Sequence, residues 1–146
     1  MAITTNAIAN SFKKELLEAK HNFTQTSGDQ FKLALYTNSA TLGKSTTSFT
    51  TDHQVANTGQ YTSGGGKLAK GSQQTSVASS VAIVDFADRS FTGVTLTARG
   101  ALIYNTSNSN TAVAVLDFGG DKTATAGTFT IQFPAFTTSA AILRIS

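Results

Sequence analysis

The stretch FTGVTLTARGALIYN, residues 91–105, decides the fold that this sequence predicts, together with TSNSN (106–110) and TAVAVLDF (111–118) that follow it. Val, Leu, Ile and aromatic residues favour the pleated surface of a β-strand. The short run of Ser, Thr and Asn between the two apolar arms is typical of a turn. We therefore predict a β-hairpin over residues 91–118.

Part of this hairpin is apolar on both faces. Up to Thr97 the apolar residues alternate with Thr, as in a half-buried strand, but residues 101–104 (ALIY) and 112–116 are apolar without alternation. A strand of that kind must be covered on both faces, either by the domain's own layers or by another subunit. The predicted oligomerising surface is this hairpin plus the C-terminal strand, with candidate residues Leu102, Tyr104, Val113, Val115, Ile142 and Ile145.

Composition limits the classes of function. A chain of 146 residues is long enough for one domain that buries roughly two-thirds of its unfolded surface. The lack of Cys excludes disulfides and thiolate metal sites. No apolar run approaches the length of a membrane span and the N-terminus lacks a signal-peptide pattern, so we expect no membrane partner. The net charge of +3 forms no basic stripe with interleaved aromatics, so we expect no nucleic-acid partner.

The first 24 residues are predicted to form a separate unit, an extended arm followed by one amphipathic helix. Asn10 or Ser11 can cap a helix of about three turns whose apolar stripe contains Phe12, Leu16, Ala19 and Phe23. This stripe either caps an open end of the β domain or docks on a neighbouring subunit. Phe12 and Leu16 are therefore candidate interface residues.

Residues 25–146 are predicted to form the β domain. Turn residues at 88–89, 105–110, 119–121 and 134 separate apolar segments, which we interpret as strands at 31–37, 54–56, 67–74, 81–86, 91–104, 111–118, 128–133 and 141–145. Six to eight short strands with one short N-terminal helix predict an all-β fold, a β-sandwich with jelly-roll or Greek-key (immunoglobulin-like) wiring.

A long polar segment, residues 38–66, ends in three consecutive glycines. Gly66-Lys67 is followed by Leu68, where a phosphate-binding Walker loop requires Ser or Thr, so we reject that motif. The glycines instead allow the backbone to bend or to pass close to another chain. Gly64, Gly65 and Gly66 are therefore candidate contacts with a partner.

The sequence does not predict an active site. His21, interpreted as a residue at the end of the helix, and His53 are the only histidines, and they lack zinc-ligand spacing, so we expect no metal and no cofactor. The pairs Asp85/Asp88 and Asp117/Asp121 lie at strand ends, where they are turn residues, calcium ligands or a catalytic pair. Turn residues are the simplest interpretation, and we predict that the protein is not an enzyme.

Several segments together resemble a family of small virion structural proteins of tailed bacteriophages. They are NSFKKELLEAKHNF, GDQFKLALYTNSATLG, TDHQVANTGQYTSGGGKL, VDFADRSFTGVTLTARGALIYN, AVAVLDFGGDKTATAGTFTIQFP and AILRI, and the most specific parts are residues 97–105 and 114–122. The resemblance covers nearly the whole chain and carries no catalytic residues. It implies a late structural protein located in the virion, either on the capsid or in the tail.

A small, non-catalytic, disulfide-free β protein fits best as a capsid decoration or cement protein on the capsid surface. Such a protein binds itself, as a trimer or another closed ring, and binds the major capsid protein, here through the N-terminal arm and the glycine-rich loop. The alternative is a tail-associated structural or receptor-binding protein.

Overall fold

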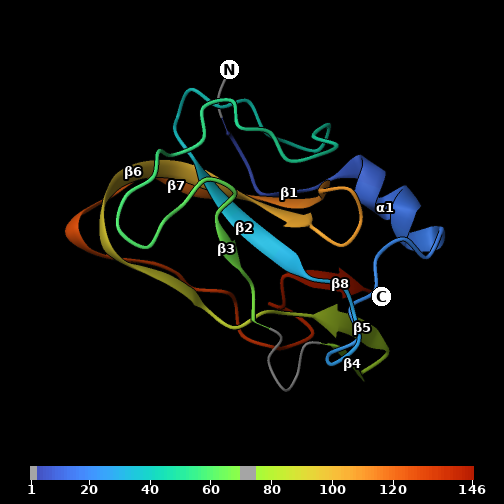
Figure 1. Cartoon of the computed structure of the whole chain (residues 1–146). Coiled ribbons are helices and arrows are strands. Elements are labelled where there is room, and N and C mark those ends of the chain that lie inside the picture. The colour runs from blue at the N-terminus through green and yellow to red at the C-terminus, as the bar shows by residue number, and fades with distance from the viewer. Residues whose placement is uncertain (1–2, 70–74) are drawn as a thin grey trace.

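The computed structural model describes residues 3–69 and 75–146, which fold into two antiparallel sheets and one helix (Figure 1). The larger sheet has the order β1 (Ala7–Ile8), β7 (Thr111–Ile131), β6 (Arg89–Asn105), β2 (Phe31–Tyr36) and β3 (Gly66–Lys67). The smaller sheet has the order β4 (Thr75–Ala78), β5 (Val81–Val84) and β8 (Leu143–Ile145). The helix α1 is Asn10–Leu17. The predicted all-β sandwich with one short helix is confirmed.

The predicted hairpin is the centre of the larger sheet, and it is longer than expected. β6 and β7 pair from Asn105 with Thr111 at the turn to Arg89 with Ile131 at the far end, and form one curved ribbon (Figure 1). The turn predicted at residues 119–121 is wrong, because β7 continues through it. Between the pairs Ala98–Lys122 and Gly100–Asp117, β6 advances by two residues and β7 by five, so the Gly-rich segment forms a bulge.

The chain's own loop covers one face of the hairpin. Tyr104 pairs with Lys32 of β2, and its ring stacks on Phe49 of the loop 38–65 with 4.7 Å between centroids. Tyr36 lies on the same face of β2 as Lys32. Its hydroxyl donates a hydrogen bond of 2.6 Å to the carbonyl of Thr50 in the same loop. The long polar segment is therefore a structural cover over the hydrophobic core.

Aromatic side chains fill the space on the opposite face of β2. Phe31 and Phe23 stack with 4.6 Å between centroids, and Phe86 and Phe12 complete the cluster. Both faces of the hairpin are thus covered within one chain. The prediction that a partner contacts four hairpin residues is corrected, since each is at most 2% exposed: Leu102, Tyr104, Val113 and Val115.

The helix is two turns long, shorter than predicted. It ends before Ala19, whose φ of 59° is left-handed, and its N-cap is Ala9, which provides no side-chain hydrogen bond. Phe23, which was predicted to lie on the helical stripe, lies beyond the helix, and its ring contacts that of Phe12 with 6.0 Å between centroids. Ile3 is fully buried and β1 pairs with β7. Residues 3–23 therefore belong to the same core as the sheets, and the boundary predicted at residue 24 does not separate two units.

The glycine-rich loop passes close to β2 of its own chain. A Cβ on Gly65, whose φ is 78°, would lie 1.8 Å from the carbonyl oxygen of Leu33. Gly66 belongs to β3 and pairs with Leu33, and the Gly64 carbonyl accepts a hydrogen bond of 2.5 Å from the Tyr104 hydroxyl. The expectation that these glycines approach another chain is therefore corrected.

Two other predicted strands differ from the structure. The segment 54–56 contributes a single bridge, between Gln54 and Tyr36. Of the strand predicted at 67–74, only Lys67 lies in a strand, and residues 70–74 lie outside the described residues. Within residues 3–69 and 75–146, no helix is long and apolar enough to cross a membrane.

Candidate functional site

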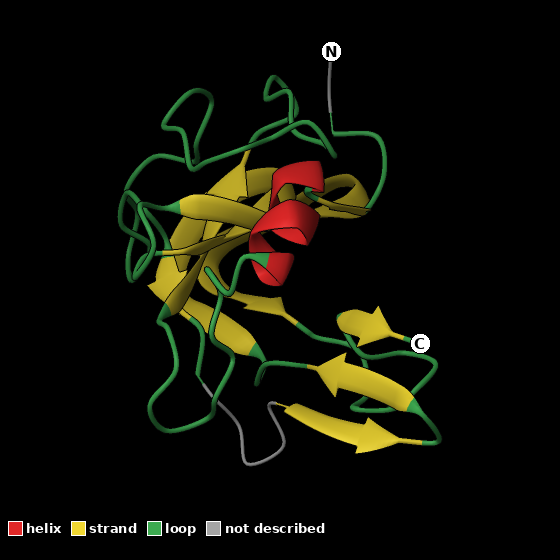
Figure 2. Cartoon of the chain, turned by 90° about the vertical axis from the view of Figure 1, so that its right-hand side faces the viewer, coloured by secondary structure: helices red, strands yellow, loops and turns green. Residues whose placement is uncertain are grey.

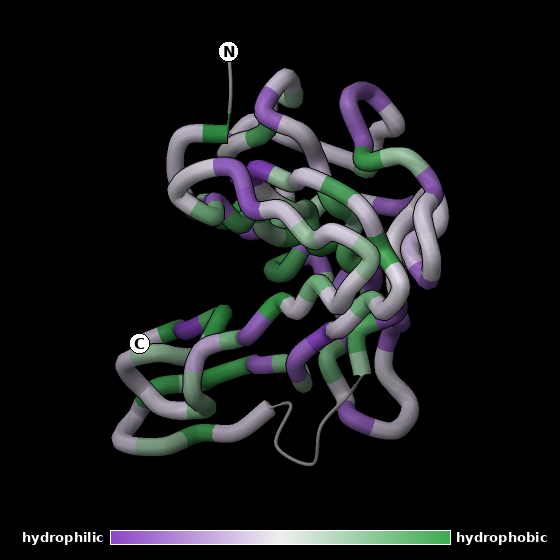
Figure 3. Tube along the Cα trace, turned by 90° about the vertical axis from the view of Figure 1, so that its left-hand side faces the viewer, coloured by the Kyte–Doolittle hydropathy of each residue, from purple (hydrophilic) through white to green (hydrophobic). Residues whose placement is uncertain are grey.

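A cleft of about 670 Å³ opens between α1 and the three-stranded sheet. In Figure 2 the helix lies beside the larger sheet and above the smaller one, and Figure 3 shows the same two layers from the other side, with the C-terminus at the edge of the smaller layer. We call this site the cleft. Its walls come from α1 and Phe23 on one side and from β5, β8 and residues 138 and 142 on the other. Most of the side chains that line it are apolar, so it is suited to bind apolar groups.

The sheet wall is a regular apolar surface. The register places Val84 beside Leu143 and Ala82 beside Ile145. Side chains two residues apart share a face of a strand, so these four lie on one face. Leu143 is 9% exposed because it packs into the core, whereas Ile145 is 58% exposed. The apolar wall therefore extends beyond the core and ends in the open part of the cleft.

The helix wall presents a side chain that the sequence analysis did not select. Leu17 is 90% exposed and lines the cleft with Phe12 and Leu16. It lies next to the apolar stripe instead of on it, so the stripe alone does not predict it. An additional apolar residue at the end of a short amphipathic helix is the signal that could have indicated a second contact surface.

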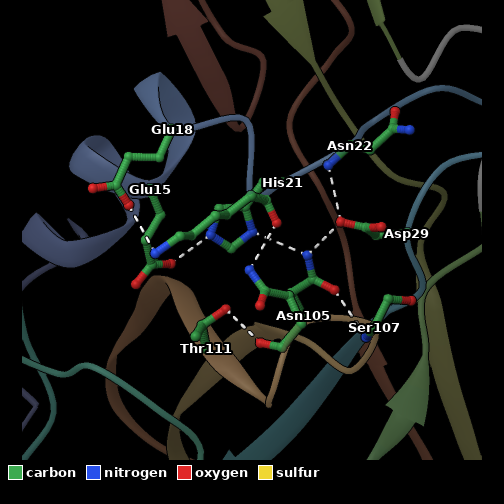
Figure 4. Close-up of polar contacts among 10 residues, drawn as sticks. Glu15, Glu18, His21, Asn22, Asp29, Asn105, Ser107 and Thr111 are labelled. Carbon is green, nitrogen blue, oxygen red and sulfur yellow. Dashed lines mark hydrogen bonds and ion pairs between the residues drawn. The ribbon is translucent and has the colours of Figure 1, made fainter.

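A buried polar network fixes the helix wall to the tip of the hairpin (Figure 4). The His21 ring contacts Glu15 of α1 through Nε2 at 2.7 Å and Asn105 of β6 through Nδ1 at 3.0 Å. The Asn105 amide nitrogen also donates to Asp29 Oδ2 at 2.7 Å. His21 was predicted to be a residue of the helix end, but it lies beyond the helix and its side chain is fully buried.

The hydrogen bonds of Asn105 indicate which nitrogen of the His21 ring is the acceptor. The Ser107 backbone N–H donates to the Asn105 side-chain oxygen at 2.9 Å, so the amide nitrogen is the group that faces His21. That nitrogen donates, and Nδ1 of His21 must accept. Nε2 therefore carries the ring proton and donates it to Glu15. The imidazole connects helix and hairpin through both ring nitrogens, so it has a structural role and no free nitrogen for a metal.

The aspartates of the two predicted pairs hold loops and strand ends. Asp85 accepts from the Phe86 N–H, Asp88 from the Phe133 N–H, and Asp121 from the Asn38 side chain. Asp117 accepts from the Gly119 N–H and forms an ion pair of 3.1 Å with Arg99. In the part of the chain that is described, no group of three or more His, Asp or Glu could hold a metal ion.

Burial raises the pKa of the Asp85 carboxyl, and the nearby Asp88 charge acts in the same direction. The folded chain thus binds this proton more tightly than the unfolded chain, so the stabilisation is complete below the unfolded pKa, about 4, and is lost as the pH rises through the folded pKa. Asp85→Asn removes this dependence. We expect the variant to gain stability relative to the parent chain between pH 3.5 and pH 7, measured by urea unfolding at both values.

Asp117→Asn is the matched control for this prediction. The Gly119 N–H lowers the pKa of Asp117, assisted by Arg99, so its stabilisation is present above the unfolded pKa and is lost as the pH falls through the folded pKa. The two variants should change stability with opposite dependence on pH. If the stability of both variants, relative to the parent chain, changed in the same direction with pH, the environments assigned to Asp85 and Asp117 would be wrong.

A second pocket of about 510 Å³ lies next to β7 and shares Ile142 with the cleft. Its walls include Phe118, Phe129 and Phe133, and its carboxylate is that of Asp117. Because Asp117 is paired with Arg99, this pocket lacks an unpaired acid for catalysis. The cleft is therefore the stronger candidate for a functional surface.

The cleft brings together four of the residues that the sequence analysis selected. Phe12 and Leu16 come from the helix, and Ile142 and Ile145 come from the C-terminal segment. The other seven candidates, in the hairpin and the glycine-rich loop, do not line it. No protein-family model, no curated protein and no solved structure matches this chain.

Proposed function

We propose that this protein is a non-enzymatic structural protein of a phage virion, a capsid decoration or cement protein that binds the major capsid protein and stabilises the head. The observation that carries the proposal is the open apolar cleft. A soluble chain that leaves Leu17 and Ile145 more than half exposed on its two walls has a surface suited to a protein partner. The resemblance to small virion proteins supplies the class of assembly in which that partner is found.

The remainder of the structure is compatible with an assembly role. The hairpin is covered on both faces by its own chain, so the fold does not need a partner to complete its main core. Stability comes from aromatic packing and from the His21–Asn105 network, without any Cys. A preformed domain loses little conformational entropy on binding, which suits a contact repeated over a capsid lattice.

Purified protein and phage heads that lack it provide the test. We expect the protein to bind these heads in hundreds of copies and to raise the temperature at which they burst. Presence in only a few copies at the tail of intact virions, with no binding to heads, would contradict the proposal. Binding of a host surface glycan or protein by such a tail component would support the alternative function.

Acidic substitutions in the cleft should weaken attachment. Leu17→Asp and Ile145→Asp each place a charge on an apolar wall, and we expect at least a 10-fold weaker affinity for heads, about 1.4 kcal/mol. Both side chains are exposed, so the melting temperature should change little. Head-binding isotherms and thermal unfolding measure the two effects.

Val77→Asp is the matched control for these substitutions. Val77 is 71% exposed and lies on the same face of the smaller sheet, but it does not line the cleft. Its substitution should leave the affinity for heads unchanged. An equal loss of affinity for all three variants would show that the effect is not specific to the cleft.

A further inference from the structure

The cleft follows the edge of a β-strand. β8 is the outermost strand of its sheet and has β5 as its single neighbour among the described strands. Five consecutive residues, 142–146, line the cleft. The face of a strand would present alternate residues only, so an unbroken series indicates that the free edge of β8 borders the cleft. Such an edge offers backbone N–H and C=O groups to an added strand.

The side chains around that edge can pack against the side chains of an added strand. Leu16 and Leu17 lie on the helix wall, and Leu143 and Ile145 lie on the sheet wall. A strand added to that edge would continue the smaller sheet, and every second side chain would lie on the face that Leu143 and Ile145 share, directed toward the helix wall. Its apolar residues would then cover Leu17 and Ile145, the two most exposed apolar side chains of the cleft.

The charged side chains of the cleft are of one sign. Among residues 3–69 and 75–146, Lys13 and Arg144 are the charged side chains that line it, one on each wall, and no Asp or Glu does so. Neither residue forms an ion pair with any described residue, although Arg144 Nη1 donates to the Ser139 carbonyl at 2.7 Å. An occupant with carboxylates would complement both cations.

From these three observations we infer that the cleft binds an extended segment of the partner protein, added as an antiparallel strand to the free edge of β8. The segment alternates apolar and polar residues and carries carboxylates that contact Lys13 and Arg144. This inference rests on the proposed function, since it specifies how the capsid protein would be held. It assigns the affinity to backbone pairing and the specificity to the two cations.

A strand fused to the chain tests the inference directly. We would extend the full chain after Ser146 with the turn Asn-Gly, which favours a tight hairpin, and the segment Asp-Val-Thr-Val-Thr-Asp. We expect at least 10-fold slower amide hydrogen exchange in β8 and a melting temperature higher by about 4 °C. The matched control Asp-Val-Thr-Pro-Thr-Asp breaks the pairing and should give neither effect.

The charge requirement has its own control. A fused segment with Lys at both ends should raise the melting temperature less than the acidic segment, and in the double variant Lys13→Glu/Arg144→Glu the order should reverse. Equal shifts for both segments in both backgrounds would overturn the role of the two cations. Unchanged exchange in β8 with the acidic segment would overturn strand addition.

Head binding separates this inference from the proposed function. If the acidic fusion blocks attachment and the proline control does not, the cleft is the site of the partner segment. Normal attachment of the acidic fusion would overturn the inference while the proposed function stands. Failure of the unmodified protein to bind heads would overturn the proposed function. If the unmodified protein alone is an oligomer with β8 protected from exchange, a second copy fills the cleft and the inference is wrong.

Discussion

Gly65→Ala should destabilise the fold by about 3 kcal/mol or more, enough to lower the melting temperature by roughly 10 °C. The added Cβ would lie 1.8 Å from the Leu33 carbonyl oxygen, which is backbone of β2, a strand paired with β6 and β3 on its two edges, and cannot move without breaking the sheet. The φ of 78° adds strain that any L-residue other than Gly experiences. Thermal and urea unfolding of the purified variant measure the loss.

Substitutions of two other glycines separate the two contributions to this loss of stability, the steric clash of the added Cβ and the strain of a positive φ. Gly93 also has a positive φ, 64°, but a Cβ there meets nothing within 4 Å, so Gly93→Ala should cost about 1–2 kcal/mol. Gly43 has open space and no positive φ, so Gly43→Ala should leave stability nearly unchanged. If Gly65→Ala were as well tolerated as Gly43→Ala, the close passage of the glycine loop over β2 would be refuted.

Asn105→Ala should cost about 3 kcal/mol, because it leaves several buried groups without partners. The side chain is fully buried and bonds to His21, Asp29 and the backbone N–H of Ser107. Without it, Nδ1 of His21 has no donor in a site that excludes water. Urea unfolding should show the loss, and hydrogen exchange should show earlier opening of α1, which the network ties to the hairpin.

Asn108→Ala is the control for this substitution. Its side chain donates a single hydrogen bond of 2.8 Å to the Lys20 carbonyl in an exposed setting, so we expect a cost below about 1 kcal/mol. Asn105→Asp keeps the volume but removes both donors, and should destabilise at neutral pH at least as much as Asn105→Ala. Full stability of Asn105→Asp would contradict the assigned direction of these hydrogen bonds.

The sequence predicted the need for a cover over the hairpin but not its identity. Apolar residues without alternation in 101–104 require cover on both faces, whatever supplies it. The loop 38–65 supplies it on one face with few apolar residues, among them Phe49 and Tyr61, and with hydroxyl hydrogen bonds to β2. Such contacts join residues far apart in the chain and leave no local periodic pattern, so the alternative of a partner subunit remained open.

Local turn chemistry was the least reliable signal. Gly119-Gly120-Asp121 predicted the end of a strand, but the hairpin pairing on both sides holds β7 together across it. Ala19 has a left-handed conformation without being Gly, so the early end of α1 had no sequence signal. Where long-range pairing or packing competes with a local preference, the long-range contacts decide.

The candidate site was predicted in part. The reason is that an apolar terminal segment and the apolar stripe of a helix can both be recognised in the sequence. An apolar terminal segment requires pairing, which selected Ile142 and Ile145, and the helical stripe selected Phe12 and Leu16. Their meeting in one cleft depends on the placement of the smaller sheet opposite α1. Sequence periodicity describes one element at a time and therefore could not predict that placement, or the role of Leu17.

The bulge in β7 has a consequence for how the length of this chain can vary. Between the pairs Ala98–Lys122 and Gly100–Asp117 the bulge already interrupts the alternation of side chains, so one residue added or removed there changes the size of the bulge, while the pairing with β6 keeps Phe129 and Ile131 directed inward. Gly119 and Gly120 have open space where side chains would be added. Natural or engineered changes of one or more residues at this point are therefore compatible with the fold, and residues added here would project into solvent.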